Sequence, residues 1–221
     1  MMDQNRVTGY INSLDKGHGM LLDRIAREAR AGFVPIIRRE TANLLQTMIA
    51  ATKPMRILEV GTAVGYSALL MAQVMPEGAQ ITTIEKYEPR IPLAREHFHQ
   101  AGMQERITLI EGDAEEVLKE LDGPFDFIFM DAAKGQYIHW LPRVLELMRE
   151  GAVLFSDNVL QDGDIIESRF AVERRNRTIH SRMREYLYTL THHDVLQTSI
   201  IPIGDGVTLS VKVNMKNNRK T

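Results

Sequence analysis

The sequence contains no cysteine, and this absence excludes three kinds of chemistry at once. Disulfide bonds, thiolate metal sites and cysteine nucleophiles are impossible in a chain of 221 residues that has no thiol. A chain that depends on no disulfide suits a reducing compartment, so we expect a cytoplasmic protein.

Long apolar runs and a strong net charge are also missing. No stretch approaches the ~18 continuous apolar residues that mark a membrane span, and residues 1–19 lack an apolar signal-peptide core, so we expect no membrane partner. The net charge is −2, so any basic surface has to be local. Hydrophobic residues make up 44% of the chain, which is ordinary for one globular domain.

Short apolar runs alternate with helical patterns from residue 54 onward. Strands are predicted at 55–60, 80–87, 106–114, 124–133 and 152–158, with helices between them at 66–75, 89–102, 114–121 and 137–151. This alternation predicts an α/β fold with a parallel sheet and helices on both faces. A long helix is predicted at 164–190. Strands at 195–203 and 206–213, joined through Gly204-Asp205-Gly206, predict an antiparallel hairpin.

We interpret residues 1–221 as a single domain, because no linker divides the chain. Residues 1–53 form an N-terminal helical cap with helices at 19–32 and 35–51, and the second helix begins at Pro35. Residues 54–213 form the core, and residues 214–221 form a polar tail.

The residues that follow the predicted parallel strands carry acidic or glycine-rich chemistry. Because ligands bind outside the carboxyl ends of strands in an open α/β sheet, these residues should converge on one site. The loop at 61–65 is G-x-x-x-G rather than the dinucleotide fingerprint, and the acid Glu59 before it suits a cation better than a pyrophosphate. Glu85 is placed to hold ribose hydroxyls, and Asp113-Ala114 to read an adenine edge. A nucleoside with a positive, amine-bearing tail fits this set, which indicates S-adenosylmethionine.

The segments "ILEVGTAVGYSALLMA", "IEGDAEEVL", "FDFIFMDAAKGQY", "VLFSDNVL" and "IPIGDGVTLSVK" resemble the cation-dependent, class I S-adenosylmethionine O-methyltransferases of the catechol and caffeoyl-CoA type. The resemblance covers about residues 35–213. It implies a Rossmann-like methyltransferase fold, with a seven-stranded, mostly parallel sheet whose last strand is antiparallel. Many relatives of this type are dimers, so a homodimer is expected by analogy.

The resemblance also implies roles for particular residues. Asp131, Asp157 and Asn158 would bind a divalent cation, Mg²⁺ or alternatively Mn²⁺, and Lys134 and Asp131 would act in catalysis. The cofactor site would be lined by Ile37, Glu59, Gly61, Ser67, Glu85, Asp113, Ala114 and Asp131. Three simpler interpretations stay open, in which Asp157-Asn158 is a plain turn, Lys134 is a solvated residue and Glu85 is an ordinary exposed acid.

The sequence motifs indicate the reaction more clearly than they indicate the methyl acceptor. The predicted helix at 164–190 turns an apolar stripe inward and arginines outward, and these arginines are Arg174, Arg175, Arg177, Arg182 and Arg184. A second basic cluster, which includes Arg38 and Arg39, lies near the cofactor entrance. They are either solvated residues balanced by nearby acids or ligands for phosphates.

The chain also resembles the bacterial branch that methylates 5-hydroxyuridine at the wobble position of tRNA. The 5-hydroxyl of that base lies beside the 4-carbonyl, much like the paired oxygens of a catechol. Our hypothesis is therefore that tRNA is the substrate, and a small-molecule catechol is the alternative. A non-catalytic nucleotide- or RNA-binding module is a third possibility, against which the intact Asp131, Lys134, Asp157 and Asn158 speak.

Overall fold

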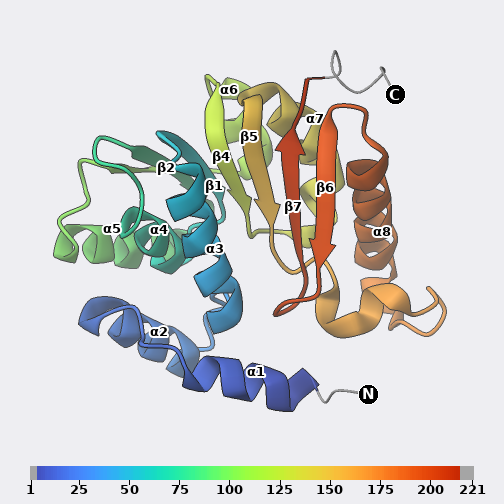
Figure 1. Ribbon diagram of the computed structural model, residues 1–221, viewed down its shortest axis with the longest axis horizontal. Helices are drawn as coiled ribbons and strands as arrows, with labels where there is room; N and C mark the ends of the chain where they lie inside the picture. Colours follow the sequence, from blue (N-terminus) through green and yellow to red (C-terminus); the bar gives the residue numbers. More distant parts are fainter. Residues whose placement is uncertain (1–3, 215–221) are drawn as a thin grey trace.

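The computed structural model describes residues 4–214, so most of the polar tail expected at 214–221 lies outside the described residues. Seven strands form one sheet in the order β3-β2-β1-β4-β5-β7-β6 (Figure 1). The first five strands pair in parallel, and β7 runs antiparallel to both β5 and β6, which confirms the predicted sheet. The strands are β1 (Arg56–Val60), β2 (Gln80–Glu85), β3 (Ile107–Glu111), β4 (Phe125–Met130), β5 (Met148–Ser156), β6 (Leu196–Ile201) and β7 (Val207–Lys212).

Helices cover both faces of the sheet, and the alternation of side chains along the strands explains why. Ile57, Phe127 and Val153 belong to one apolar core, whereas their neighbours Leu58 and Ile128 belong to the other. Helices α2 to α5 pack on the first face and α6 to α8 on the second. The helices are α1 (Gln4–Ser13), α2 (Met20–Ala31), α3 (Arg39–Thr52), α4 (Tyr66–Ala72), α5 (Ile91–Gln100), α6 (Ala114–Glu120), α7 (Tyr137–Leu147) and α8 (Arg177–His192).

The N-terminal helices α1 and α2 run across the end of the sheet where the parallel strands finish, at the bottom of Figure 1. The segment between them is held to α3, because Asp15 pairs with Arg39 at 2.8 Å and accepts a hydrogen bond from Asn43 at 3.3 Å. The predicted cap therefore lies over the carboxyl edge of the sheet.

Two predicted helix starts are wrong. Helix α3 begins at Arg39 rather than Pro35, because Arg38 has extended backbone (φ −65°, ψ 152°) and acts as the N-cap residue. Residues 34–38 are therefore free of helical structure and run along the site described below.

The predicted helix at 164–190 begins only at Arg177, where α8 starts. Residues 161–166 and 174–176 form short 3₁₀ turns, with irregular chain between them. Side chains of α8 donate hydrogen bonds to carbonyl oxygens of the segment before this helix. Arg177 donates to the carbonyls of Val172 and Phe170, and Arg184 donates to those of Ile165 and Glu167. Side chains thus supply the hydrogen bonds that a helix would otherwise make.

The predicted helix at 137–151 is also shorter than expected. It ends at Leu147, and β5 begins at Met148 rather than at 152. Within residues 4–214, no helix is both long enough and apolar enough to cross a membrane.

Candidate active site

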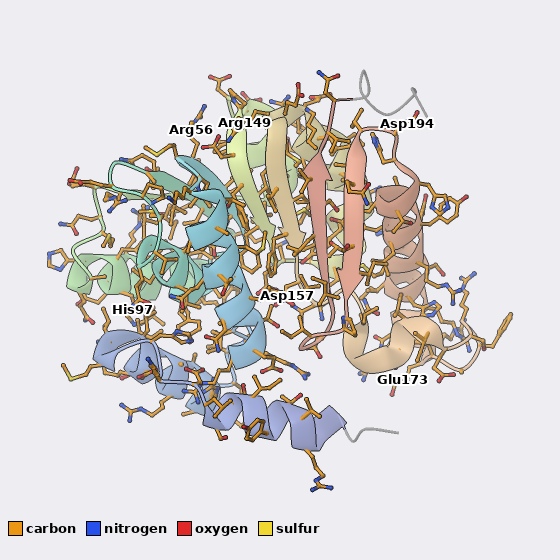
Figure 2. The ribbon with its side chains drawn as sticks, viewed as in Figure 1. Arg56, His97, Arg149, Asp157, Glu173 and Asp194 are labelled. Atoms are coloured by element: carbon orange, nitrogen blue, oxygen red, sulfur yellow. The ribbon has the colours of Figure 1, made fainter. Side chains whose placement is uncertain are left out.

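A cavity of about 710 Å³ opens at the carboxyl edge of the sheet. Its wall comes from the segment 35–38 and from the loops that follow strands β1 to β5, as the sheet rule requires. Most of the residues predicted for the site border it, namely Ile37, Gly61, Ser67, Glu85, Asp113, Ala114, Asp131, Lys134 and Asn158. Glu59 and Asp157 lie directly behind this wall and are almost completely buried. Figure 2 shows Asp157 at the lower end of β5, at the opposite end of the sheet from Arg56 and Arg149.

Glycine at position 61 allows the loops after β1 and β4 to approach each other. Gly61 has φ 108°, and a Cβ atom there would lie 2.1 Å from the carbonyl oxygen of Asp131. The amide of Asp131 also donates to the carbonyl of Val60 at 3.0 Å. A side chain at Gly61 would therefore separate the loop at 61–65, here called the cofactor loop because a cofactor is predicted beside it, from the loop that carries Asp131 and Lys134.

Glu59 contacts the cavity only through another side chain. Its carboxylate accepts hydrogen bonds from the hydroxyl of Ser67 at 2.5 Å and from the hydroxyl of Thr83. Burial raises the pKa of Glu59 to about 8, although these two hydrogen bonds act in the opposite direction. Ser67 is thus the residue of this pair that a cofactor would meet first.

Glu85 is held in the cavity wall by hydrogen bonds and is not an exposed acid. Its carboxylate accepts hydrogen bonds from the backbone amides of Ala63, Lys86 and Tyr87 at 2.7, 3.0 and 2.8 Å. The side chain is only 9% exposed and faces the cavity, which suits a group that orients ribose hydroxyls.

Asp113 caps the helix that follows β3. It accepts a hydrogen bond from the amide of Glu115 at 2.9 Å and pairs with Lys86 at 3.2 Å, and both contacts lower its pKa. The hydrogen bond from Glu115 to Asp113 fixes the start of α6, where Ala114 borders the cavity.

Asp131, Asp157 and Asn158 come together at the ends of β4 and β5. The amide nitrogen of Asn158 donates to Asp131 at 2.8 Å, and its backbone amide donates to Asp157 at 2.7 Å. Asn158 has φ 63°, a conformation that asparagine tolerates better than most residues. Burial and the nearby Asp131 raise the pKa of Asp157 to about 8, and burial also raises the pKa of Asp131.

The buried carboxyl group of Asp157 and the half-buried one of Asp131 both have raised pKa values, and with the adjacent amide of Asn158 they form a donor set that fits a hard divalent cation. Such a cation would remove the like-charge repulsion between Asp131 and Asp157. Among residues 4–214, no group of three or more histidine, aspartate or glutamate side chains is arranged to hold a metal, so this set has two carboxylates and one amide only. Lys134 borders the same cavity, and its positive charge partly opposes the rise in the pKa of both aspartates.

The predicted basic residues have a mixture of partners. Arg38 pairs with Asp205, Arg39 with Asp15, and Arg175 with Glu173 at 2.7 Å. Arg182 donates to the carbonyl of Gly135 at 3.2 Å, next to Lys134, while Arg177 and Arg184 hold the irregular segment. Arg174 is exposed, and its side chain forms no hydrogen bond or ion pair within the part of the chain that the structure describes.

Sequence reasoning missed two residues of the site. Thr83 lies opposite Glu59 in the pairing of β1 with β2, and the alternation of β2 could have placed it on the same face. Asp205 borders the cavity from the β6–β7 turn, where Asp-Gly was read only as a hairpin signal. Its ion pair with Arg38 connects this turn to the cap.

A sheet of this order, with β7 reversed and a ligand-sized cavity beside a glycine loop, defines the Rossmann-like methyltransferase class. Two solved structures share the fold over nearly the whole chain. SAH-bound methyltransferase PaMTH1 of Podospora anserina has a TM-score of 0.86 and 27% identity, covering 97% of this chain and 98% of that one. TomG of Streptomyces achromogenes, an O-methyltransferase of tomaymycin synthesis in complex with SAM, has a TM-score of 0.83 and 26% identity, covering 97% and 100%.

Sequence comparison narrows the class. A family model described as O-methyltransferase matches residues 20–213, so the chain belongs to the O-methyltransferase family. A catechol O-methyltransferase of Niastella koreensis is 32% identical over 145 residues, covering 63% of this chain and 65% of that protein. A caffeoyl-CoA O-methyltransferase of Populus kitakamiensis is 31% identical over 176 residues, covering 77% and 75%.

Proposed function

We propose that the protein is an S-adenosylmethionine- and Mg²⁺-dependent O-methyltransferase that converts 5-hydroxyuridine at the tRNA wobble position to 5-methoxyuridine. The observation that carries the proposal is a single cavity bordered by Glu85, Asp113, Asp131, Lys134 and Asn158, with Asp157 directly behind its wall. Mn²⁺ is an alternative metal, because the same oxygen ligands suit it. When bound, the metal lowers the pKa of an acceptor hydroxyl and fixes its orientation.

The chain's own residues would perform the remaining steps. Glu85 would hold the ribose hydroxyls, and Ser67 and Ile37 would border the methionine end of the cofactor. Lys134 would take or share the proton of the acceptor hydroxyl and stabilise the oxygen anion that forms. One cavity would hold the cofactor beside the acceptor, and much of the rate enhancement would come from this positioning of the two reactants.

Three features support a tRNA acceptor. Helix α8 packs against the turn that carries Lys134, through the Arg182–Gly135 contact, so the segment before α8 lies at the acceptor side. Arg174 and Arg175 on that segment are both exposed and available to phosphates. 5-Hydroxyuridine offers two neighbouring oxygens, and three protein ligands would leave positions of the metal open for them.

A small catechol is the second candidate, and two observations favour it. Related proteins are described as catechol and caffeoyl-CoA O-methyltransferases. In addition, Arg38 and Arg39 are paired with acids, which reduces the positive charge available to RNA near the entrance.

Labelled S-adenosylmethionine and Mg²⁺, offered together with tRNA that lacks the modification or with a catechol panel, separate the two candidates. We expect the label in tRNA, in a nucleoside that digestion and mass spectrometry identify as 5-methoxyuridine. Label in catechols alone would establish the second candidate and reject the first. We also propose a homodimer, consistent with exposed apolar side chains of the cap such as Leu14 and Met20.

A further inference from the structure

Four buried side chains form a continuous chain of hydrogen bonds beneath the cofactor loop. The Thr62 hydroxyl lies 2.6 Å from the Thr83 hydroxyl, which contacts Glu59, and Glu59 contacts Ser67 at 2.5 Å. Glu59 and Thr83 are 0% exposed, Thr62 is 1% and Ser67 is 7%. Only Ser67 and Thr62 border the cavity, so the other two members act from behind its wall.

The strand register explains why Thr83 occupies this position. Thr83 and Glu59 are Cα partners in the parallel pairing of β2 with β1, so their side chains point to the same face. The first residues of the loop after β1 stay beside the end of β2, because the amides of Gly61 and Thr62 both donate to the carbonyl of Ile84 at 3.1 Å. Thr83 therefore contacts both the buried carboxylate and the cofactor loop.

The two oxygens of the Glu59 carboxyl group connect two hydroxyl groups. Ser67 contacts one oxygen at 2.5 Å and Thr83 contacts the other, so Glu59 links strand β2 to the start of helix α4. The Thr62 hydroxyl adds a further contact to the Thr83 hydroxyl. A change at Thr83 therefore affects Ser67 through Glu59.

We propose that Thr83 is a positioning residue of the cofactor site, which holds Glu59 and, through Glu59, the Ser67 hydroxyl that borders the cavity. This inference rests on S-adenosylmethionine being the cofactor, as proposed above. Without the Thr83 hydroxyl, one oxygen of Glu59 would be buried without this partner, so the carboxyl group and Ser67 would no longer be held in place.

Thr83→Val removes the hydroxyl and keeps the branched shape of the side chain. We expect the dissociation constant for S-adenosylmethionine, measured by calorimetry, to rise on the order of tenfold, since one hydrogen bond to a buried carboxyl group is lost. KM for the cofactor should rise similarly while kcat changes little. Thr83→Ser, which restores the hydroxyl, should return both values to within about twofold of wild type.

Thr82→Val is the matched control, because Thr82 neighbours Thr83 on the same strand and points to the opposite face. Wild-type binding is measured first: no binding of S-adenosylmethionine by the wild type would reject the proposed function itself. If the wild type binds and Thr83→Val binds equally well, or if Thr83→Ser fails to restore binding, the positioning role is wrong.

If Thr83→Val does not fold, Thr62→Val tests the same chain from its other end. It removes the hydroxyl that contacts Thr83 without emptying the space between the strands. We expect a weaker rise in KM of the same kind, and an unchanged KM for a folded Thr62→Val would overturn the proposal.

Discussion

Individual carboxyl groups determine the chemistry of this site, because the fold removes several of them from water. Asp157 is 2% exposed and Glu59 is fully buried, and burial raises the pKa of each to about 8. Asp131 adds to the effect on Asp157, because a second negative charge nearby disfavours ionisation further. The pair Asp131–Asp157 is thus strained electrostatically when it is ionised and relieved when a cation binds.

The first prediction concerns the pH dependence of the metal effect. In the metal-free protein, raised pKa values mean that folding is favoured most below the unfolded-state pKa of about 3.9, and that this contribution is lost as pH rises through about 8. Mg²⁺ binds the ionised pair, so it should raise Tm more at pH 8.5 than at pH 6.5. Thermal scans with and without Mg²⁺ at both pH values measure the difference.

Asp157→Asn is the control for this experiment, since it removes the buried charge and keeps the side-chain shape. Its Tm should respond little to Mg²⁺ at either pH, and without metal it should lose less stability than wild type between pH 6.5 and 8.5. A Mg²⁺ effect on the wild type that is equal at both pH values, or larger at pH 6.5, would contradict the assignment of the carboxyl pair.

The residue scale also shows how far sequence alone reaches. Glu85, Asp113, Asp131 and Asn158 could be predicted because each lies at the carboxyl end of a parallel strand or within two residues after it, and such positions meet at one sheet edge. Thr83 could not be singled out, because threonine is common in strands and its partner depends on the register between β1 and β2. Arg182 was among the predicted basic residues, but its hydrogen bond to Gly135 could not be predicted because it depends on how α8 packs.

At the scale of elements, helix α8 and the irregular chain before it behave as one unit. Arg177, Arg184 and His180 bind carbonyl oxygens of the chain between Ile165 and Val172. These side chains hold the segment in shape, so they are poor choices for testing contact with RNA. Arg174 and Arg175 are better choices, because Arg174 has no side-chain partner within residues 4–214 and Arg175 forms only an exposed pair with Glu173.

The second prediction concerns these two arginines. Arg174→Glu combined with Arg175→Glu should reduce kcat/KM for tRNA on the order of tenfold or more and leave Tm nearly unchanged, because phosphate contacts are lost and no packing is. The salt dependence of tRNA binding should become shallower, as measured by filter binding between 50 and 200 mM salt.

Methylation of a small catechol by the same double variant serves as the control and should be unaffected. Arg184→Glu provides a contrast, since it should lower Tm by releasing the irregular segment. Undiminished tRNA methylation by the Arg174/Arg175 variant would mean that this surface is only solvated.

Elements were predictable where the hydrophobic pattern alone decides them. Strands β1 and β4 and residues 152–156 of β5 are buried on both faces and are mostly apolar, which the local sequence reveals. The start of α3 was not, because Pro35 is compatible with a first helical turn, whereas residues 35–38 are not helical and line the cavity. The chain at 161–176 has a helical pattern but takes its hydrogen bonds from α8.

At the scale of the whole molecule, the N-terminal cap covers the carboxyl end of the sheet, where the candidate site lies. The opposite end of the strands is remote from this site. Helices α1 and α2 lie over the carboxyl edge in Figure 1, and the Arg38–Asp205 pair connects the cap segment to the β6–β7 turn. The cavity therefore has a wall contributed by the first forty residues as well as by the sheet. This arrangement makes the site depend on the complete fold of the single domain.

The central claim is that a divalent metal held by Asp131, Asp157 and Asn158 activates an acceptor oxygen for methyl transfer. The most direct measurement is transfer of label from S-adenosylmethionine by the wild type and by Asp157→Ala, with Mg²⁺ and with EDTA. We predict that EDTA abolishes turnover by the wild type, that Mg²⁺ restores it, and that Asp157→Ala binds the cofactor but stays inactive with Mg²⁺. Full activity in EDTA, or an active Asp157→Ala, would contradict the account.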